Sequence, residues 1–291
     1  MKNTGLNLQL EQEHRKETDW EHGIGTDKQL LGASQITRCI AEILPEARRQ
    51  YLPAGELQNI GQEKMDCASR SIINILETKF NFLLQNNLLP ERQYNFLQEY
   101  LTPNGIEFSD AAIAIWSGTT REGNSLIAPC EAVHKHGLVP KKLLPQLDTF
   151  EAHHDPKRIT PEIERIAKEF NSLFSINYIR VLEKDFKAVR EWEMLDGGGF
   201  AWPQPTNGFY PRVEYDFNHA FMQIKNDIEA FDNYFDSVDG DYIKQLAPDY
   251  KLVDYAYRLV ITIKKKSQEQ RGIIDWLKWY FWEIMKRIST T

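Results

Sequence analysis

The chain is poor in three features that would assign a class at once: cysteine, net positive charge and long apolar runs. Its three cysteines, Cys39, Cys67 and Cys130, are too few for a disulfide framework and suit a reducing compartment. A formal net charge of -7 and a pI near 5.6 give nucleic-acid binding no electrostatic support. No segment approaches the roughly 18 apolar residues of a membrane span, and residues 1–17 lack a signal-peptide core. We therefore expect a cytoplasmic protein.

Length and overall composition are those of a globular protein. The chain has 291 residues, of which 42% are hydrophobic and 26% charged. That is enough to bury a sizeable core in one large domain or two modest ones. Residues 1–30 are polar and aperiodic, which is typical of a loosely docked arm. We expect an N-terminal arm (1–50), a main domain (51–263) and a basic C-terminal helix (264–291).

The main domain is predicted to be helical first and rich in strands later. Apolar residues recur near helical spacing over 68–84, and Thr160-Pro161 is typical of a helix start. Strand-like segments follow at 176–182, 220–225, 233–236 and 255–263. This partial segregation of helices and strands predicts an α+β fold.

Cys67 lies at or just before the N-terminus of the first long predicted helix. The thiolate is the nucleophilic form of cysteine, and both a helix N-terminus and a neighbouring imidazolium lower the thiol pKa. His219 opens one predicted strand and Asp236 ends the next. If those strands pair in antiparallel fashion, the carboxylate comes near enough to hold the tautomer of the imidazole. Taken singly, each residue also fits a plain role: a buried cysteine, a structural histidine, a turn aspartate.

Four ordered parts of the chain resemble papain-like (C1-type) cysteine peptidases, most closely the disulfide-poor relatives found in phage and bacterial genomes. The segments concerned are 52–58 with 66–69, 108–125, 136–140, and 218–220 with 235–237. The resemblance implies a two-lobe α+β fold, with the Cys67 helix in a helical lobe and His219 and Asp236 in a β-barrel-like lobe. It implies hydrolysis of polypeptides through an acyl-enzyme, without a cofactor. It also implies association with a virion if the chain is phage-encoded.

The resemblance assigns roles to individual residues. Cys67 is implied to be the nucleophile, His219 the base and then the acid, and Asp236 the residue that orients the imidazole, where most of the family have asparagine. The oxyanion-hole glutamine usually lies six residues before the cysteine. Gln58 lies nine before and Gln62 five before, and we favour Gln58 for its sequence context. The residues implied to contact substrate are Gly123, Asn124 and Asn218.

Two positions depart from the family's pattern. Ala68 stands where an aromatic residue commonly follows the nucleophile, and Val238 stands where a tryptophan follows the orienting residue by two positions. Both departures remove packing around the imidazole. Two alternatives stay open: a transglutaminase-like acyl transferase, which also uses a Cys–His–Asp set, and a catalytically silent scaffold or binding protein.

Three further features are weighed against function. His153-His154-Asp155 lacks the other ligands of a metal site, so no metal is expected. Gly197-Gly198-Gly199 lacks the strand-then-helix context of a phosphate loop and is predicted to be a turn. The segment 271–288 has an apolar helical face, and from Lys264 onward seven Lys/Arg stand against three Asp/Glu. That pattern predicts a helix that packs on its own domain, on a membrane surface or on a partner protein.

Overall fold

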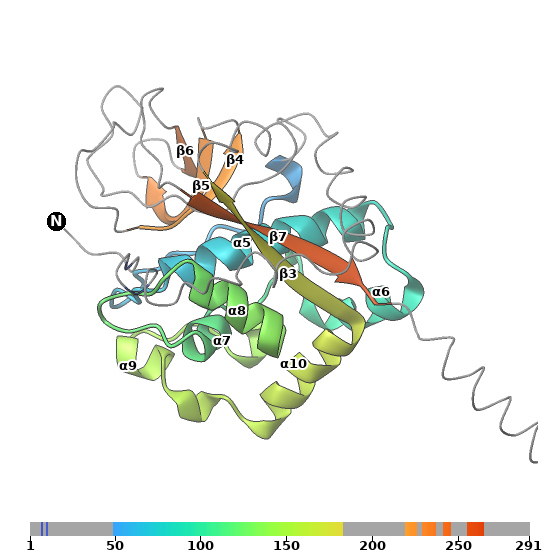
Figure 1. The fold of residues 1–291 in the computed structure, drawn as a ribbon, viewed down its shortest axis with the longest axis horizontal. Helices are drawn as coiled ribbons and strands as arrows, with labels where there is room; N and C mark the ends of the chain where they lie inside the picture. Colours follow the sequence, from blue (N-terminus) through green and yellow to red (C-terminus); the bar gives the residue numbers. More distant parts are fainter. Residues whose placement is uncertain are drawn as a thin grey trace, which may run out of the picture.

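One helix, α5 (Cys67–Gln85), lies at the centre of the fold, between a group of strands and a group of helices (Figure 1). The computed structural model describes residues 7, 10, 49–182, 219–225, 229–236, 241–245 and 255–264. Every α5 residue from Cys67 to Leu84 is buried. One face of α5 is polar, and its side chains Arg70, Asn74, Glu77 and Asn81 satisfy their burial with hydrogen bonds to other parts of the chain.

Within the described ranges, the other helices come before residue 174. They are η1 (Arg49–Tyr51), α6 (Glu91–Leu97), η2 (Gln98–Tyr100), α7 (Asp110–Trp116), α8 (Ile127–His136), η3 (Lys141–Leu143), α9 (Phe150–His153), η4 (Pro156–Arg158) and α10 (Pro161–Leu173). Ser109, Thr149 and Thr160 cap α7, α9 and α10, each accepting a hydrogen bond from the N–H three residues later. These caps satisfy donors that a helix N-terminus leaves open. The predicted helix start at Thr160-Pro161 is confirmed.

The described strands form three antiparallel groups. A short hairpin joins β1 (Leu101–Thr102) to β2 (Gly105–Ile106). The long strand β3 (Phe174–Leu182) pairs along its whole length with β7 (Tyr255–Ile263). A three-stranded sheet has the order β4 (Met222–Lys225), β5 (Glu229–Asp236) and β6 (Asp241–Gln245).

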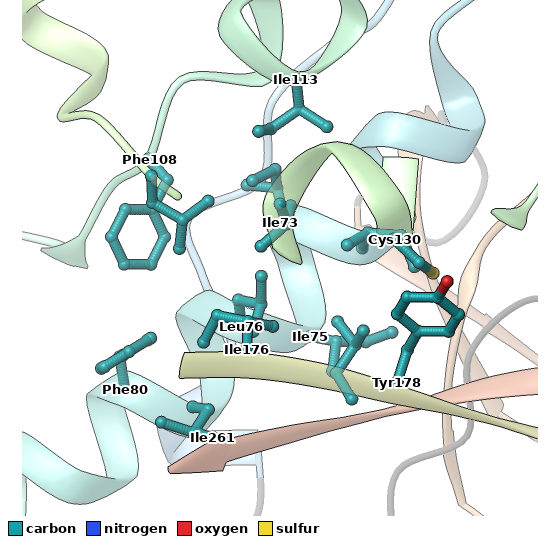
Figure 2. Close-up of a cluster of buried hydrophobic side chains, with 14 of the residues drawn as sticks. Ile73, Ile75, Leu76, Phe80, Phe108, Ile113, Cys130, Ile176, Tyr178 and Ile261 are labelled. Atoms are coloured by element: carbon teal, nitrogen blue, oxygen red, sulfur yellow. The ribbon is translucent and has the colours of Figure 1, made fainter. Parts of the chain in front are cut away.

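A continuous apolar core joins α5 to the helices and to the β3–β7 pair. Phe80 of α5 makes edge-to-face contacts, with ring centroids 5.1 to 5.9 Å apart, to Phe108, Phe170 and Phe174. Figure 2 shows further side chains of α5 beside those of the helices and of both long strands, among them Ile73, Leu76, Ile113, Ile176 and Ile261. Cys130 lies fully buried in the same core, with its thiol donating to the Leu126 carbonyl over 3.4 Å. This environment makes Cys130 a packing residue.

The predicted α+β class is confirmed, and the predicted helix over 68–84 is α5. The described strands belong to separate small sheets, so the two-lobe arrangement and the barrel-like lobe stay predictions. The predicted arm and C-terminal helix lie almost wholly outside the described residues. No helix in the described ranges is both long and apolar enough to cross a membrane.

Candidate active site

Cys67 is the first residue of α5, and its sulfur contacts the segment that leads into β4. The Ala220 N–H donates to Cys67 Sγ over 3.3 Å. Only 1% of Cys67 is exposed. The first N–H groups of a helix have no intrahelical carbonyl partner, and the Cys67 N–H is one of them.

His219, the neighbour of Ala220, is held by a carboxylate. Its Nε2 lies 2.8 Å from Oδ1 of Asp232 on β5, and both side chains are buried. The Asn233 N–H donates to the same Oδ1 over 2.6 Å. An ionised carboxylate only accepts hydrogen bonds, so Nε2 carries the proton of the neutral ring and Nδ1 carries the lone pair. In this tautomer Nδ1 is the basic atom.

The carboxylate that meets the imidazole is Asp232, not Asp236 as the resemblance implies. The two strands do pair in antiparallel fashion, but β5 begins at Glu229, four residues earlier than expected. The observed register, continued by three residues, puts His219 opposite Tyr234. Asp232 and Asp236 are then its two diagonal neighbours, and the ring bonds the first of them. Asp236 itself ends β5, where it pairs with β6.

Tyr234 packs against the imidazole and was missed by the sequence analysis. Its ring centroid lies 5.3 Å from that of His219, with the ring planes at 60°. In the family's pattern a tryptophan follows the orienting residue by two positions. With Asp232 as the orienting residue that position is Tyr234, whereas with Asp236 it is Val238. The Tyr234 hydroxyl donates to Oε2 of Glu63 over 2.6 Å. Burial raises the pKa of Tyr234 far above its usual value, so the phenol stays a donor.

Of the two candidate glutamines, Gln58 is the one bonded to β5, the strand whose Asp232 contacts His219. Gln58 is fully buried, and its backbone N–H donates to the Asn233 carbonyl over 2.9 Å. Its side-chain amide donates to Oε1 of Glu63 over 2.5 Å. Gln62 is exposed, and its amide oxygen accepts from the Phe150 N–H over 3.2 Å.

The surroundings of Cys67 favour the neutral thiol. Burial raises the pKa of Cys67 well above its usual value. The Ala220 N–H lowers it, and the carboxylates of Asp66, Glu63 and Asp232 raise it further. The sulfur is therefore a thiol at rest, and its proton has to be removed by a base at the moment of attack.

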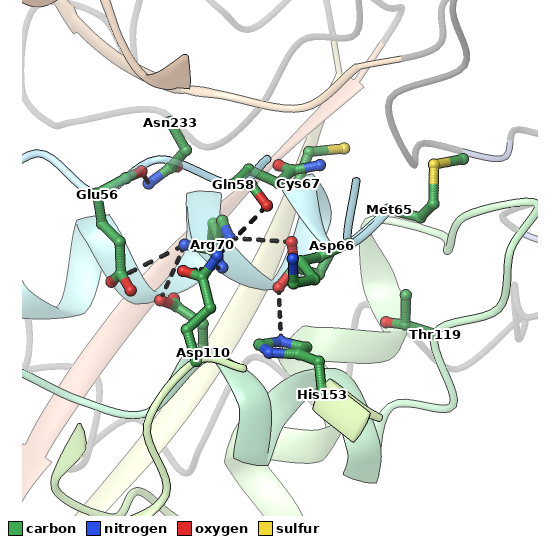
Figure 3. Close-up of polar contacts among 12 residues, drawn as sticks. Glu56, Gln58, Met65, Asp66, Cys67, Arg70, Asp110, Thr119, His153 and Asn233 are labelled. Atoms are coloured by element: carbon green, nitrogen blue, oxygen red, sulfur yellow. Dashed lines mark hydrogen bonds and ion pairs between the residues drawn. The ribbon is translucent and has the colours of Figure 1, made fainter. Parts of the chain in front are cut away.

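A buried ionic cluster, which we call the Arg70 cluster, lies on the other side of this turn of α5 (Figure 3). The Arg70 guanidinium donates from Nε to Asp66 Oδ1 over 2.9 Å, from Nη1 to Asp110 Oδ2 over 3.3 Å and from Nη2 to Gln146 Oε1 over 3.0 Å. The second oxygen of Asp66 lies 3.1 Å from His153 Nε2. His153, weighed above only as a metal ligand, is thus a member of this cluster.

The charges within the Arg70 cluster are balanced. Burial alone would raise the pKa of Asp66, but Arg70 and His153 hold it well below its usual range. Burial raises the pKa of Asp110 well above its usual value in spite of Arg70, and Glu56 adds to the rise. Asp66 therefore stays ionised beside the guanidinium, while burial favours the protonated form of Asp110.

Gly123 and Asn124, implied to contact substrate, belong to a tight loop. Thr120 and Gly123 form an antiparallel bridge, with a φ of 95° at the glycine that other residues rarely adopt. The buried Asn124 side chain donates to Ser117 Oγ over 2.9 Å and so maintains the loop. The Asn124 carbonyl accepts from the Asn7 N–H over 2.7 Å. An extended peptide would use the same kind of backbone contact.

Asn218, the glycines at 197–199 and the segment 271–288 lie outside the described residues. In the part of the chain that is described, no group of three or more His, Cys, Asp or Glu side chains could hold a metal ion.

Comparison with solved structures finds a distant likeness. No protein-family profile matches the chain, and no curated protein matches it. The crystal structure of xylellain, a cysteine protease from Xylella fastidiosa, matches with 14% identity and a TM-score of 0.47. The match covers 74% of this chain and 85% of that chain. A likeness at this level assigns neither a fold nor an activity.

Proposed function

We propose that this chain is a papain-like cysteine peptidase in which Cys67 is the nucleophile, His219 the base and Asp232 the residue that orients the imidazole. One chain of contacts carries the proposal: Ala220 N–H on Cys67 Sγ at 3.3 Å, and the adjacent His219 on Asp232 at 2.8 Å. A thiol at a helix start, with an oriented histidine from a separate element, is what acyl transfer by cysteine requires.

In the first half-reaction, Nδ1 of His219 accepts the Cys67 proton while the sulfur attacks the carbonyl carbon of a peptide bond. Asp232 stabilises the imidazolium that forms. The imidazolium then gives its proton to the leaving amine, the C–N bond breaks, and a thioester remains on Cys67. Water next loses a proton to His219 and attacks the thioester, which releases a carboxylic acid and returns the proton to the sulfur.

The carbonyl oxygen becomes negative during both attacks and needs hydrogen-bond donors. We assign this role to the Gln58 side-chain amide and the Cys67 backbone N–H. The N-terminus of α5 adds a partial positive charge at the same place. Donors held in advance by a protein are worth more than water here, because they need no reorganisation when charge develops.

The test is digestion of a positional-scanning peptide library, with products identified by mass spectrometry. Wild type is expected to cleave, and Cys67→Ala should lose activity by about 10⁶-fold, to background. Cys130→Ala is the matched control, because it truncates another fully buried cysteine that belongs to the core. Equal product formation by wild type and Cys67→Ala would remove Cys67 from the reaction.

A carboxylate beside His219 favours a second candidate, the transglutaminase-like acyl transferase, which shares the Cys–His–Asp set. Added hydroxylamine separates the two activities: a transferase forms hydroxamates in preference to free acids, whereas a peptidase releases mainly acids. The 1% exposure of Cys67 is the observation that favours a silent scaffold. A scaffold would yield neither product, in wild type as in Cys67→Ala.

A further inference from the structure

Glu63 lies between Gln58 and Cys67, in the stretch that makes their separation nine residues rather than six. Its carboxylate accepts three hydrogen bonds. Oε1 accepts from Gln58 Nε2 over 2.5 Å and from the Met65 N–H over 3.2 Å, and Oε2 accepts from the Tyr234 hydroxyl over 2.6 Å. One side chain therefore joins β5, the Gln58 segment and the turn that leads into α5.

Each of the three donors borders a different part of the reacting centre. Gln58 is the assigned oxyanion donor. The Tyr234 ring lies 5.3 Å from the imidazole of His219. Met65 precedes Cys67 by two residues and adopts a φ of 57°, in the left-handed region that favours glycine.

We propose that Glu63 is a positioning residue, which sets the direction of the Gln58 amide, the seat of Tyr234 on His219 and the turn at Met65. This inference rests on the proposed function, since it assigns those three groups to one reaction.

The contact with Gln58 explains how the amide is aimed. A primary amide has two N–H donors in one plane, so the bond to Glu63 fixes the plane and with it the direction of the second N–H. Hydrogen bonds to an ionised carboxylate are roughly twice as strong as neutral ones. The amide is thereby held in one orientation before any substrate arrives, as an oxyanion donor needs to be.

The contribution of Glu63 is geometric, because its charge acts in the opposite direction. A carboxylate near the sulfur disfavours the thiolate, and Glu63 is one of the groups that raise the pKa of Cys67. A residue retained for charge at this place would hinder the reaction. A residue that fixes three partners at once helps it by keeping their geometry.

The experiment compares Glu63→Ala with Glu63→Gln on the best peptide from the library. Positioning predicts that Glu63→Ala lowers kcat by about 10- to 100-fold and leaves KM within about twofold. Glu63→Gln should stay within about threefold of wild type, since its amide oxygen still accepts from Gln58 and Met65 and its nitrogen can donate to the Tyr234 oxygen. Glu107→Ala is the matched control: Glu107 is also half-buried, and its partners are Thr102 at 3.1 Å and Lys141 at 3.5 Å.

Three results overturn the inference: an unchanged kcat in Glu63→Ala, a Glu63→Gln variant as slow as Glu63→Ala, or a faster Glu63→Ala, which would make Glu63 an inhibitory plug. If Glu63→Ala does not fold, Tyr234→Phe takes its place, because it deletes only the hydroxyl that Glu63 accepts. It should then lower kcat about threefold or more, and an unchanged kcat overturns the inference equally.

The proposed function and the inference can fail separately. If wild type transforms no peptide, the proposed function fails, and the rate of Cys67 alkylation by iodoacetamide becomes the readout for Glu63. Glu63→Ala and Glu63→Gln both remove the negative charge that disfavours the thiolate, so the two variants are compared with each other. Positioning of His219 through Tyr234 predicts about fivefold slower alkylation in Glu63→Ala than in Glu63→Gln at neutral pH. The same rate in the two variants overturns the positioning role. If wild type cleaves peptides and Glu63→Ala matches it, only the inference fails.

Discussion

The two sides of the first turn of α5 hold adjacent residues in opposite states. Asp66 is ionised, and its two oxygens are bound at 2.9 Å by Arg70 and at 3.1 Å by His153. Cys67, the next residue, is a neutral thiol that receives the Ala220 N–H at 3.3 Å. Burial favours the neutral form of both residues, and charge decides the outcome: Arg70 lowers the pKa of Asp66, whereas nearby carboxylates add to the rise that burial gives the pKa of Cys67.

The Asp66 side of this turn anchors α5, whereas the Cys67 side carries the proposed reactive groups. The Arg70 cluster ties the start of α5 to α7 and α9 with charge-assisted hydrogen bonds, which fix its position. The Cys67 side carries the groups through which a proton would move, from sulfur to imidazole. A reacting group is best placed when the element that bears it is held by residues outside the reaction.

The largest effect on stability is expected from removing the guanidinium of the Arg70 cluster. Arg70→Met leaves Asp66 and Asp110 buried without their guanidinium, and the free energy of unfolding should fall by about 3–5 kcal/mol. Arg165→Met is the control, because the Arg165 side chain is 65% exposed and pairs with Glu169 one helical turn away. The free energy of unfolding of Arg165→Met should stay within about 0.5 kcal/mol of wild type. Urea unfolding measures both, and equal losses would mean that the Arg70 cluster does not hold α5.

Among the proposed site residues, the largest effect after loss of Cys67 is expected from Gln58, the proposed oxyanion donor. Gln58→Ala should lower kcat by about 10²- to 10³-fold, as removal of one such donor does elsewhere. Gln62→Ala deletes an exposed side chain bonded to the Phe150 N–H and should change kcat less than about twofold. Steady-state kinetics on the best library peptide measures both variants. A larger loss in Gln62→Ala would transfer the role to that residue.

A finer test asks which carboxylate serves His219. Asp232→Ala removes the acceptor of Nε2, so kcat should fall by about 100-fold, whereas Asp236→Ala should leave it unchanged. In Asp232→Asn, kcat should lie within about tenfold of the wild-type value. The N–H groups of His219 and Asn233 both point at Oδ1, so the amide oxygen is drawn to that position and the tautomer is kept.

The same kinetic assay can also contradict the role of Asp232. If Asp236→Ala is the slower of the two alanine variants, the imidazole turns to its other diagonal neighbour during catalysis. If Asp232→Asn is as slow as Asp232→Ala, the negative charge on the imidazole partner matters more than the tautomer.

The sequence predicted those parts of the fold that depend on local pattern. The apolar periodicity of 68–84 gave α5, and Thr160-Pro161 gave the start of α10, because spacing and capping are properties of neighbouring residues. The place of Cys67 at a helix start followed from the same pattern. The antiparallel pairing of the strands after His219, which entered as a condition, is present.

What could not be predicted depends on register and on distant pairs. Asp232 and Asp236 are equivalent in sequence pattern, and only the register of β4 against β5 decides which one lies beside the ring. Contacts such as Asp66 with His153, or Glu63 with Tyr234, join residues 87 and 171 positions apart. No periodicity marks such pairs, although Asp232-Asn233-Tyr234 already held the aromatic residue that the family's pattern requires.

The smallest expected effect is a shift in the pH profile of Cys67 alkylation, and it tests the neutral state of the sulfur. Burial raises the pKa of Cys67, and Asp232 adds to the rise. A raised pKa means that the thiolate forms only at higher pH. The midpoint of the alkylation rate against pH should therefore lie above the ordinary thiol pKa of about 8.5. Asp232→Asn removes one charge, so its midpoint should lie below that of wild type, whereas Glu107→Ala should match wild type. Fast alkylation that is level from about pH 5 to 7 would instead reveal a thiolate–imidazolium pair. The two sides of the turn would then both be ionic, and His219 would already hold the proton before substrate binds.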